Sequence, residues 1–185
     1  MKVCFVTKNK SKFSEARTLL EPCGVVLAQS GIDVIEPQLP SQEEVVLEKA
    51  RQAFCKIKKP VIVDDTCIYF DAYRNFPGTM TKDLFNRIGY EGIRKLLNGL
   101  KKGAYFQTMI CYKDKKACRV FAGRWKGRIV STVSRKINPE WSYNSIFVPD
   151  GFSVPLSEIP MEERLKHSHR KKAILKMVRY MRCKK

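Results

Sequence analysis

The sequence lacks any long apolar run. No stretch of its 185 residues approaches the ~20 consecutive apolar residues of a membrane-spanning helix, and the N-terminus lacks the hydrophobic region of a signal peptide. Internal repeats, low-complexity tracts and linkers are also missing. Because 44% of the residues are hydrophobic, which suits a globular core, we expect one domain over residues 1–185. We expect it to be cytoplasmic and to have no membrane partner.

Histidine is scarce and the cysteines are scattered. The only histidines are His167 and His169, and no two of the seven cysteines have CxxC spacing. No zinc-binding quartet emerges from this set. An odd, unclustered group of cysteines in a chain without a secretion signal indicates reduced thiols rather than a disulfide framework.

Acidic residues are half as frequent as basic ones. The chain has 36 Lys and Arg against 18 Asp and Glu, a formal net charge of +18. This charge predicts attraction to polyanions. Three explanations stay open: nucleic-acid binding, a pocket for a highly charged small anion such as a nucleotide, or a compositional bias with a solvated basic surface.

The hydrophobic pattern predicts a mixed α/β domain. Helices are expected from Asn9 or Ser11 to about Pro22, from Ser41 to about Lys58, near 81–87, at 90–99 and from Ser168. Strands are expected at 2–7, 60–64, 104–112, 117–123, 126–133 and near 143–148, with turns at 113–116 and near Gly123. Ser41 and Glu44 have the spacing of a capping box.

Two adjacent carboxylates follow an apolar run. Val61, Ile62 and Val63 predict a strand buried on both faces, and Asp64 and Asp65 come directly after it. A buried strand has no structural need for two negative charges at its end. Open α/β sheets place ligand sites at the C-terminal ends of their strands. Two carboxylates there could hold Mg²⁺, which proteins bind through one or two carboxylates plus phosphates.

Lysines are concentrated where they are hard to explain structurally. Lys8, Lys10 and Lys12 lie in the turn that begins the first helix, where the helix dipole favours anions. Lys49 lies inside or beside the apolar stripe of the second helix. A bound phosphate would account for them. The alternatives are an exposed basic turn and a lysine whose ammonium reaches water.

A second helix start also carries cations. Ser168 is placed to cap a helix whose first turn holds His169 and Arg170, which oppose the dipole unless a ligand is bound there. Just upstream, Trp141 and Tyr143 could stack on a base, although aromatics at this spacing are more often strand packing.

Four segments resemble motifs of the inosine triphosphate pyrophosphatase family, which removes deaminated purine nucleoside triphosphates. TKNKSK at 7–12 resembles its T-G-N-x-x-K motif, and VIVDDTCIYFDAYRNFPG at 61–78 its central acidic signature. WSYNSIF at 141–147 is similar to F-G-[WY]-D-P-I-F, and SHRKKA at 168–173 to S-H-R-x-x-A. The four motifs occur in family order and spacing. The resemblance implies a central twisted mixed sheet flanked by helices, with an active-site cleft between two lobes.

The resemblance assigns roles to individual residues. It implies that the acidic residues Glu36, Asp64 and Asp65 bind Mg²⁺, for which Mn²⁺ could substitute, and that Asp65 is the general base. Lys49 would act with Asp65 in catalysis and bind phosphate. The remaining substrate contacts would come from Thr7, Lys8, Asn9, Lys12, Thr66, Trp141, Tyr143, Asn144, Arg164, His169 and Arg170. Pyrophosphate would be released from a nucleoside triphosphate by a homodimeric enzyme.

This chain departs from the family pattern at four positions. Lys8 and Ser142 replace glycines, and Arg164 replaces a lysine near the base. Asn144 replaces an aspartate of the base pocket, so base selectivity is open. Two alternatives to a purine triphosphatase therefore remain: the same chemistry on standard or pyrimidine triphosphates, and a basic nucleic-acid-binding module. The second leaves the acidic pair unexplained.

Overall fold

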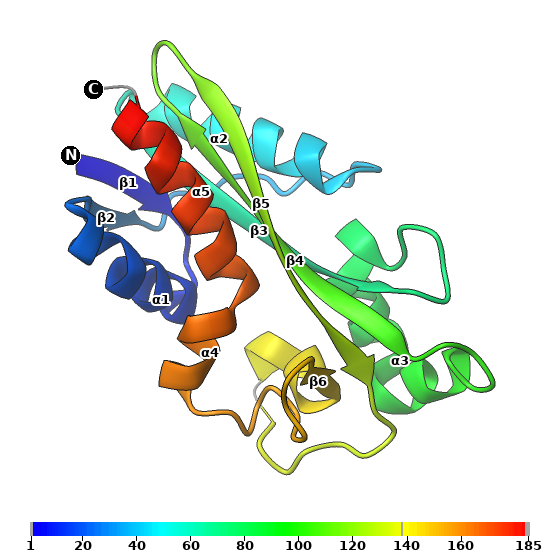
Figure 1. The fold of residues 1–185 in the computed structure, drawn as a ribbon. Helices are drawn as coiled ribbons and strands as arrows, with labels where there is room; N and C mark the ends of the chain where they lie inside the picture. Colours follow the sequence, from blue (N-terminus) through cyan, green and yellow to red (C-terminus); the bar gives the residue numbers. More distant parts are fainter. Residues whose placement is uncertain (1, 138, 184–185) are drawn as a thin grey trace. The chain divides into compact units, whose positions relative to one another are not determined.

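The computed structural model of the chain describes residues 2–137 and 139–183, with the side chains of 139–141 left out. Its six-stranded sheet has the order β2-β1-β3-β4-β5-β6 (Figure 1). The strands are β1 (Lys2–Val6), β2 (Val26–Ser30), β3 (Val61–Phe70), β4 (Gly103–Lys113), β5 (Cys118–Ile129) and β6 (Phe147–Pro149). The helices are α1 (Lys10–Leu20), α2 (Gln42–Ile57), α3 (Thr81–Leu96), α4 (Met161–His167) and α5 (His169–Cys183).

The sheet is mixed and flanked by helices, which confirms the predicted fold class. β1 pairs in parallel with β2 and with β3, whereas β5 and β6 are antiparallel. The chain forms two compact units, and β3, β4 and β5 contribute residues to both. Unit 1 is Met1–Thr66, Thr108–Gly123 and His169–Lys185, and unit 2 is Cys67–Gln107 and Arg124–Ser168.

In unit 1 the strands bury both faces, as alternation along a strand requires. Val3 and Phe5 of β1 pack with Ile62 of β3 and with the apolar face of α5. Val6 and Val63 belong to the opposite cluster, which α2 covers. α1 and α5 lie side by side on the first face (Figure 1).

Local capping fixes where two helices of unit 1 begin. The side chain of Asn9 accepts a hydrogen bond from the Lys12 amide at the start of α1. At the start of α2, Ser41 and Glu44 form the predicted capping box in both directions. Each cap satisfies amide donors that the helix itself cannot. The cap by Asn9 therefore holds the turn with Lys8, Lys10 and Lys12 in one conformation.

Unit 2 has its own core. Ile68 and Phe70 of β3, Phe106 of β4 and Trp125 of β5 pack with residues of α3 and of the segment 143–159. α3 is kinked at Gly89, whose φ of 57° is outside the helical region, so the two helices expected near 81–87 and 90–99 are its two halves.

Several predicted elements were wrong in extent. β3 does not end at Asp64, because residues 67–70 are apolar and extend the strand to Phe70. The strands expected at 117–123 and 126–133 are one strand, β5, so Gly123 is not a turn. Residues 139–145 form a 3-10 helix before the short β6. β2 and α4 were not predicted.

The helices within residues 2–137 and 139–183 lack the combination of length and apolar composition that a membrane span requires.

Candidate active site

Asp64 lies at the centre of an ion-pair cluster in unit 1. Its side chain is 2% exposed. Lys12 Nζ is 3.1 Å from Oδ1, and Arg170 reaches Oδ2 through Nε at 3.2 Å and Nη2 at 3.1 Å. Arg170 also pairs with Glu15 of α1 through Nη1. A buried carboxylate with both oxygens paired to cations is held in its ionised form at neutral pH.

The pKa values of the cluster follow from these contacts. Burial alone would raise the pKa of Asp64, but the charges of Lys12, Arg170 and Lys49 outweigh burial and lower it to about 2. Burial would likewise lower the pKa of Arg170, and the carboxylates of Glu15 and Asp64 raise it instead. The two side chains therefore stabilise each other's charged forms.

Lys49 joins Asp64 to a second pair of carboxylates. The Lys49 side chain is only 15% exposed; its Nζ lies 2.6 Å from Glu36 Oε1 and donates to the Asp64 carbonyl at 3.0 Å. Burial would lower the pKa of Lys49, but Glu36 and Asp65 raise it. Asp65 lies within hydrogen-bonding reach of Glu36. Lys49 thus ends at an anionic group and not in water.

Glu36 belongs to an irregular loop that α2 holds in place. Gln52 accepts a hydrogen bond from the Ile35 amide at 2.9 Å, and Lys56 donates to the Asp33 carbonyl at 2.6 Å. The Glu36 side chain is 61% exposed, so its carboxylate faces solvent beside Lys49. Burial disfavours its ionisation, yet Lys49 and then Lys12 lower its pKa.

The basic turn before α1 has acidic partners of its own. Lys8 pairs with Asp33 at an exposed position. The amide of Asn9 donates to Thr7 Oγ1 at 3.2 Å, which folds the turn toward the helix cap. Lys8 and Lys12 thus each have a carboxylate partner. The prediction that phosphate contacts explain these lysines remains untested.

A hydrogen-bonded chain connects β3, β4 and the start of α5. Arg170 Nη2 donates to Thr66 Oγ1 at 3.2 Å, and Thr66 Oγ1 lies 2.7 Å from Thr108 Oγ1. Thr108 Oγ1 is in turn 2.6 Å from His169 Nδ1. Burial, and next the charge of Arg170, lower the pKa of His169 well below its ordinary value. His169 is therefore neutral at physiological pH.

Gly123 allows α5 to approach the sheet this closely. A Cβ at position 123 would lie 2.0 Å from the His169 carbonyl and 2.6 Å from the Ala173 amide. Both are backbone atoms, which cannot move aside without shifting the helix. The glycine therefore places the first turn of α5, with His169 and Arg170, against β5.

The base-pocket candidates lie in unit 2. Tyr143 is buried, and its ring contacts Phe85 at 5.3 Å and Phe70 at 6.2 Å between centroids. These contacts favour the packing role over base stacking. Asn144 is also buried, and its carbonyl accepts from the Ser157 amide at 3.0 Å. Arg164 is part of α4. The side chain of Trp141 lies outside the described residues.

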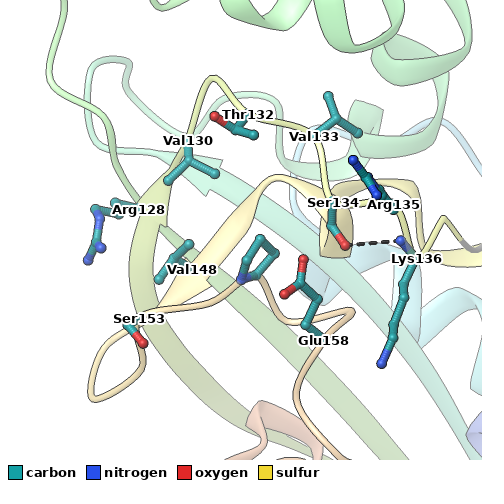
Figure 2. Close-up of a pocket in the computed structure, with 11 residues that line it drawn as sticks. Arg128, Val130, Thr132, Val133, Ser134, Arg135, Lys136, Val148, Ser153 and Glu158 are labelled. Atoms are coloured by element: carbon teal, nitrogen blue, oxygen red, sulfur yellow. Dashed lines mark hydrogen bonds between the residues drawn. The ribbon is translucent and has the colours of Figure 1, made fainter.

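Unit 2 also has a pocket of about 600 Å³ (Figure 2). Cations from Arg128, Arg135 and Lys136 line it together with Glu158 and apolar residues such as Val148. A hydrogen bond from the Lys136 amide to Ser134 Oγ, 3.1 Å long, shapes one wall. None of the predicted site residues lines this pocket.

The carboxylates fit a hard cation only in part. In residues 2–137 and 139–183, no three His, Cys, Asp or Glu side chains form a ready metal-binding group. The predicted trio of Glu36, Asp64 and Asp65 is therefore not a preformed site, because Lys12 and Arg170 take both Asp64 oxygens. Glu36 and Asp65 lie together at a half-exposed edge, and two carboxylates suffice for Mg²⁺ when phosphates supply the rest.

Four residues of the cluster were missed from the sequence. Glu15 neutralises Arg170, Thr108 connects Thr66 to His169, and Gln42 donates to the Asp65 carbonyl at 3.1 Å. The fourth is Gly123. A glycine inside an alternating pattern is a known sign of close backbone approach and could have been interpreted that way. The other three have no local signal.

The chain has relatives along almost its whole length. Residues 3–180 match the sequence model of the Ham1 family. A dITP/XTP pyrophosphatase of Saccharolobus solfataricus is 32% identical over 182 residues, 98% of this chain and 94% of that protein. An inosine triphosphate pyrophosphatase of Yarrowia lipolytica is 32% identical over 180 residues, 96% and 94% of the two chains. The solved structure of a HAM1 protein from Coxiella burnetii shares the fold, with a TM-score of 0.84, 19% identity and 98% coverage of both chains.

Proposed function

The chain belongs to the Ham1 family, and from this premise we propose that it hydrolyses non-standard purine nucleoside triphosphates such as ITP, dITP and XTP. The products are the nucleoside monophosphate and pyrophosphate. The similar proteins of S. solfataricus and Y. lipolytica carry names that describe this class of substrate. The motifs at 7–12, 61–78, 141–147 and 168–173 support the same assignment.

The observation that carries the proposal is the cluster around Lys49 in unit 1. It places two carboxylates, Glu36 and Asp65, beside a buried ammonium group, 2.6 Å from Glu36. Lys12, from the N-terminal turn of α1, contributes to the same electrostatic environment. Two carboxylates beside a buried ammonium group would weaken the binding of nucleic acid, whereas they suit a site for a metal–triphosphate.

The formal charges of the cluster favour a divalent cation. Lys12, Lys49 and Arg170 contribute three positive charges, and the carboxylates contribute four negative ones, from Glu15, Glu36, Asp64 and Asp65. The sum is −1, which would repel a triphosphate. Mg²⁺, with Mn²⁺ as a substitute, would be held by Glu36 and Asp65 and would polarise the phosphate oxygens. Asp64 would add its negative charge nearby.

Hydrolysis needs a base and a leaving group. Asp65 accepts a proton from a water molecule whose oxygen forms a bond to the α-phosphorus. The bond between that phosphorus and the bridging oxygen breaks, and its electrons leave with pyrophosphate. Lys12 and Lys49 stabilise the charge that develops on the phosphate oxygens, usually the largest catalytic contribution. Asp64 keeps Lys12 and Arg170 in position and does not itself react, because both its oxygens are paired.

The experiment is a panel of triphosphates assayed for pyrophosphate release with Mg²⁺. We expect ITP, dITP and XTP to be hydrolysed and the monophosphate to appear in equal amount. Asp65→Asn should lower kcat by about 10²–10⁴-fold, the usual worth of a general base, while the melting temperature stays unchanged. A variant that keeps more than about a tenth of kcat would show that Asp65 is not the base.

Asn144 bears on the preferred base. A carboxylate only accepts hydrogen bonds and so suits the N1–H of a 6-oxopurine, whereas an asparagine amide both donates and accepts. If Asn144 contacts the base, selectivity against ATP is weaker than an aspartate would give. The panel repeated with Asn144→Asp measures this. The same selectivity among the triphosphates in wild type and in Asn144→Asp would mean that residue 144 does not recognise the base.

The proposal includes two properties of the whole protein. We expect a cytoplasmic homodimer, by resemblance to the family. Light scattering at several protein concentrations measures the mass in solution. A constant mass of 21.4 kDa, that of one chain, would contradict the dimer.

A further inference from the structure

The outer face of α5 is a continuous basic stripe. The helix, HRKKAILKMVRYMRC, contains no acidic residue. Its exposed basic residues are Lys172, Lys176, Arg179 and Arg182, which recur every three or four positions and so lie on one side of the helix. At 1.5 Å per residue the stripe is about 15 Å long.

The orientation of α5 is fixed by its other face. Its other face carries Ala173, Ile174, Met177, Val178 and Met181, all buried in the core of unit 1. Lys176 is fixed further by donating to the Ala122 carbonyl at 2.6 Å. The stripe therefore faces solvent permanently.

The tip of the β4–β5 hairpin extends the stripe. Phe121 of β5 packs against Tyr180 of α5, with ring centroids 5.5 Å apart. Because side chains alternate along a strand, Arg119 points to the same face of β5 as Phe121. Arg119 is exposed, as are Lys115 and Lys116 in the turn. All these residues belong to unit 1. We call Lys115, Lys116, Arg119, Lys172, Lys176, Arg179 and Arg182 the basic face.

Among the described helices, α5 differs from α1, α2, α3 and α4, each of which has a cation paired with a carboxylate three or four residues away. Arg17 of α1 pairs with Glu21 just after that helix, Arg51 with Glu48 on α2, Arg94 with Glu91 on α3 and Lys166 with Glu163 on α4. Within the described residues, Arg119, Lys176, Arg179 and Arg182 form no ion pair. Like charges three or four residues apart on a helix are mutually destabilising. A bound polyanion would reverse that cost.

We propose that the basic face binds the phosphate backbone of nucleic acid. A row of exposed cations fits a row of phosphates, and binding of this kind needs no base contact. An anionic membrane fits less well, since a membrane-surface helix buries an apolar face in the lipid and that face of α5 is already in the core. This interaction is tested independently of the proposed hydrolysis, because the variants that test it leave Asp64, Asp65 and Lys49 unchanged.

The test measures salt-dependent binding of a fluorescent 20-base-pair DNA duplex by anisotropy, from about 50 to about 200 mM KCl. Arg119→Gln/Arg179→Gln/Arg182→Gln removes three charges from the basic face. The matched control, Arg87→Gln/Lys101→Gln/Lys102→Gln, removes three exposed charges from unit 2 and leaves the same net charge. Thermal unfolding confirms that both variants fold.

We expect wild type to bind with a steep salt dependence. The first variant should lose at least about tenfold in affinity, with the slope of log K against log salt reduced by about 2–3, close to one for each phosphate contact removed. The control should bind within about twofold of wild type. Equal losses in both variants would mean that net charge alone attracts DNA, and no binding by wild type would also overturn the proposal. Tighter binding to phosphatidylserine vesicles than to DNA would assign the face to membranes instead.

Discussion

The arginines at the start of α5 and on its outer face differ in burial and in pairing. At its first turn, Arg170 is 1% exposed and meets Asp64, Glu15 and Thr66. On its outer face, Arg179 and Arg182 are exposed and form no ion pair with any described residue. A buried charge must be paired because desolvation is costly, whereas water solvates an exposed one. The net charge of +18 therefore has two kinds of contributor. A few cations neutralise buried carboxylates and stabilise the fold, and others are solvated at the surface and contribute little to its stability.

This difference predicts where substitution is expensive. Arg170→Met should destabilise the protein by about 3–5 kcal/mol, because it leaves Asp64 and Glu15 buried beside too little positive charge. Urea unfolding measures the free energy. Glu15→Gln is the control, since its amide can still accept from Arg170, and it should cost distinctly less. A cost below about 1 kcal/mol for Arg170→Met would mean that the ion pairs contribute nothing net.

Acid should weaken the buried cluster. The folded-state pKa of Asp64, about 2, is below its ordinary 3.8. A depressed carboxyl pKa stabilises the fold above the unfolded-state pKa and is lost as pH falls toward 2, here about 2 kcal/mol. His169 has a lowered pKa too, so protonation of the unfolded chain removes stability already as pH falls below about 6.5.

Urea unfolding of the metal-free protein between pH 2 and pH 7 measures both contributions. Lys12→Met removes one cation beside Asp64 and should flatten the loss below about pH 4. The loss that begins near pH 6.5 should change less, because burial and Arg170 precede Lys12 among the causes that lower the pKa of His169. The same slope in wild type and Lys12→Met would show that Lys12 does not set the pKa of Asp64.

Lys49 tests whether a buried cation serves the fold or the substrate. Lys49→Ala should raise KM for the triphosphate about tenfold, about 1.4 kcal/mol, because it removes a phosphate contact beside Glu36 and Asp65. Arg51→Ala on the same helix removes an exposed cation that pairs with Glu48 and should leave KM unchanged. If Lys49→Ala alters only the melting temperature, its role is to neutralise Glu36.

Local signals in the sequence predicted more of the site than of its support. The capping box of Ser41 and Glu44 and the cap by Asn9 depend on residues three apart, and both are confirmed. The family motifs likewise directed attention to Asp64, Lys12 and Arg170. Their partner Glu15 is 155 positions from Arg170, and only the packing of α1 on α5 brings the two together.

Strand extents were predicted poorly for a similar reason. Two adjacent carboxylates suggest the end of a buried strand. β3 nevertheless continues, because strand pairing and the burial of residues 67–70 stabilise it by more than the two carboxylates destabilise it. Gly123 was interpreted as a turn, although its function is to admit the backbone of α5. The alternating pattern around Gly123 does signal a close approach, and residues 67–70 do favour a strand, but which element packs against each segment depends on parts of the chain that are far away in the sequence.

The smallest effect is expected on the outer face of α5, with the opposite sign. Arg179 lies three residues from both Lys176 and Arg182, so Arg179→Gln relieves two like-charge contacts. We expect stability to rise by about 0.2–0.5 kcal/mol, or about 1 °C in Tm for a chain of this size. The gain should vanish in about 1 M salt, where the Debye length is near 3 Å. The same variant should bind DNA more weakly, so a cation that costs stability would be retained for binding. A fall in Tm would instead mean that Arg179 already has a stabilising partner, and the contrast between the two sides of α5 would not hold.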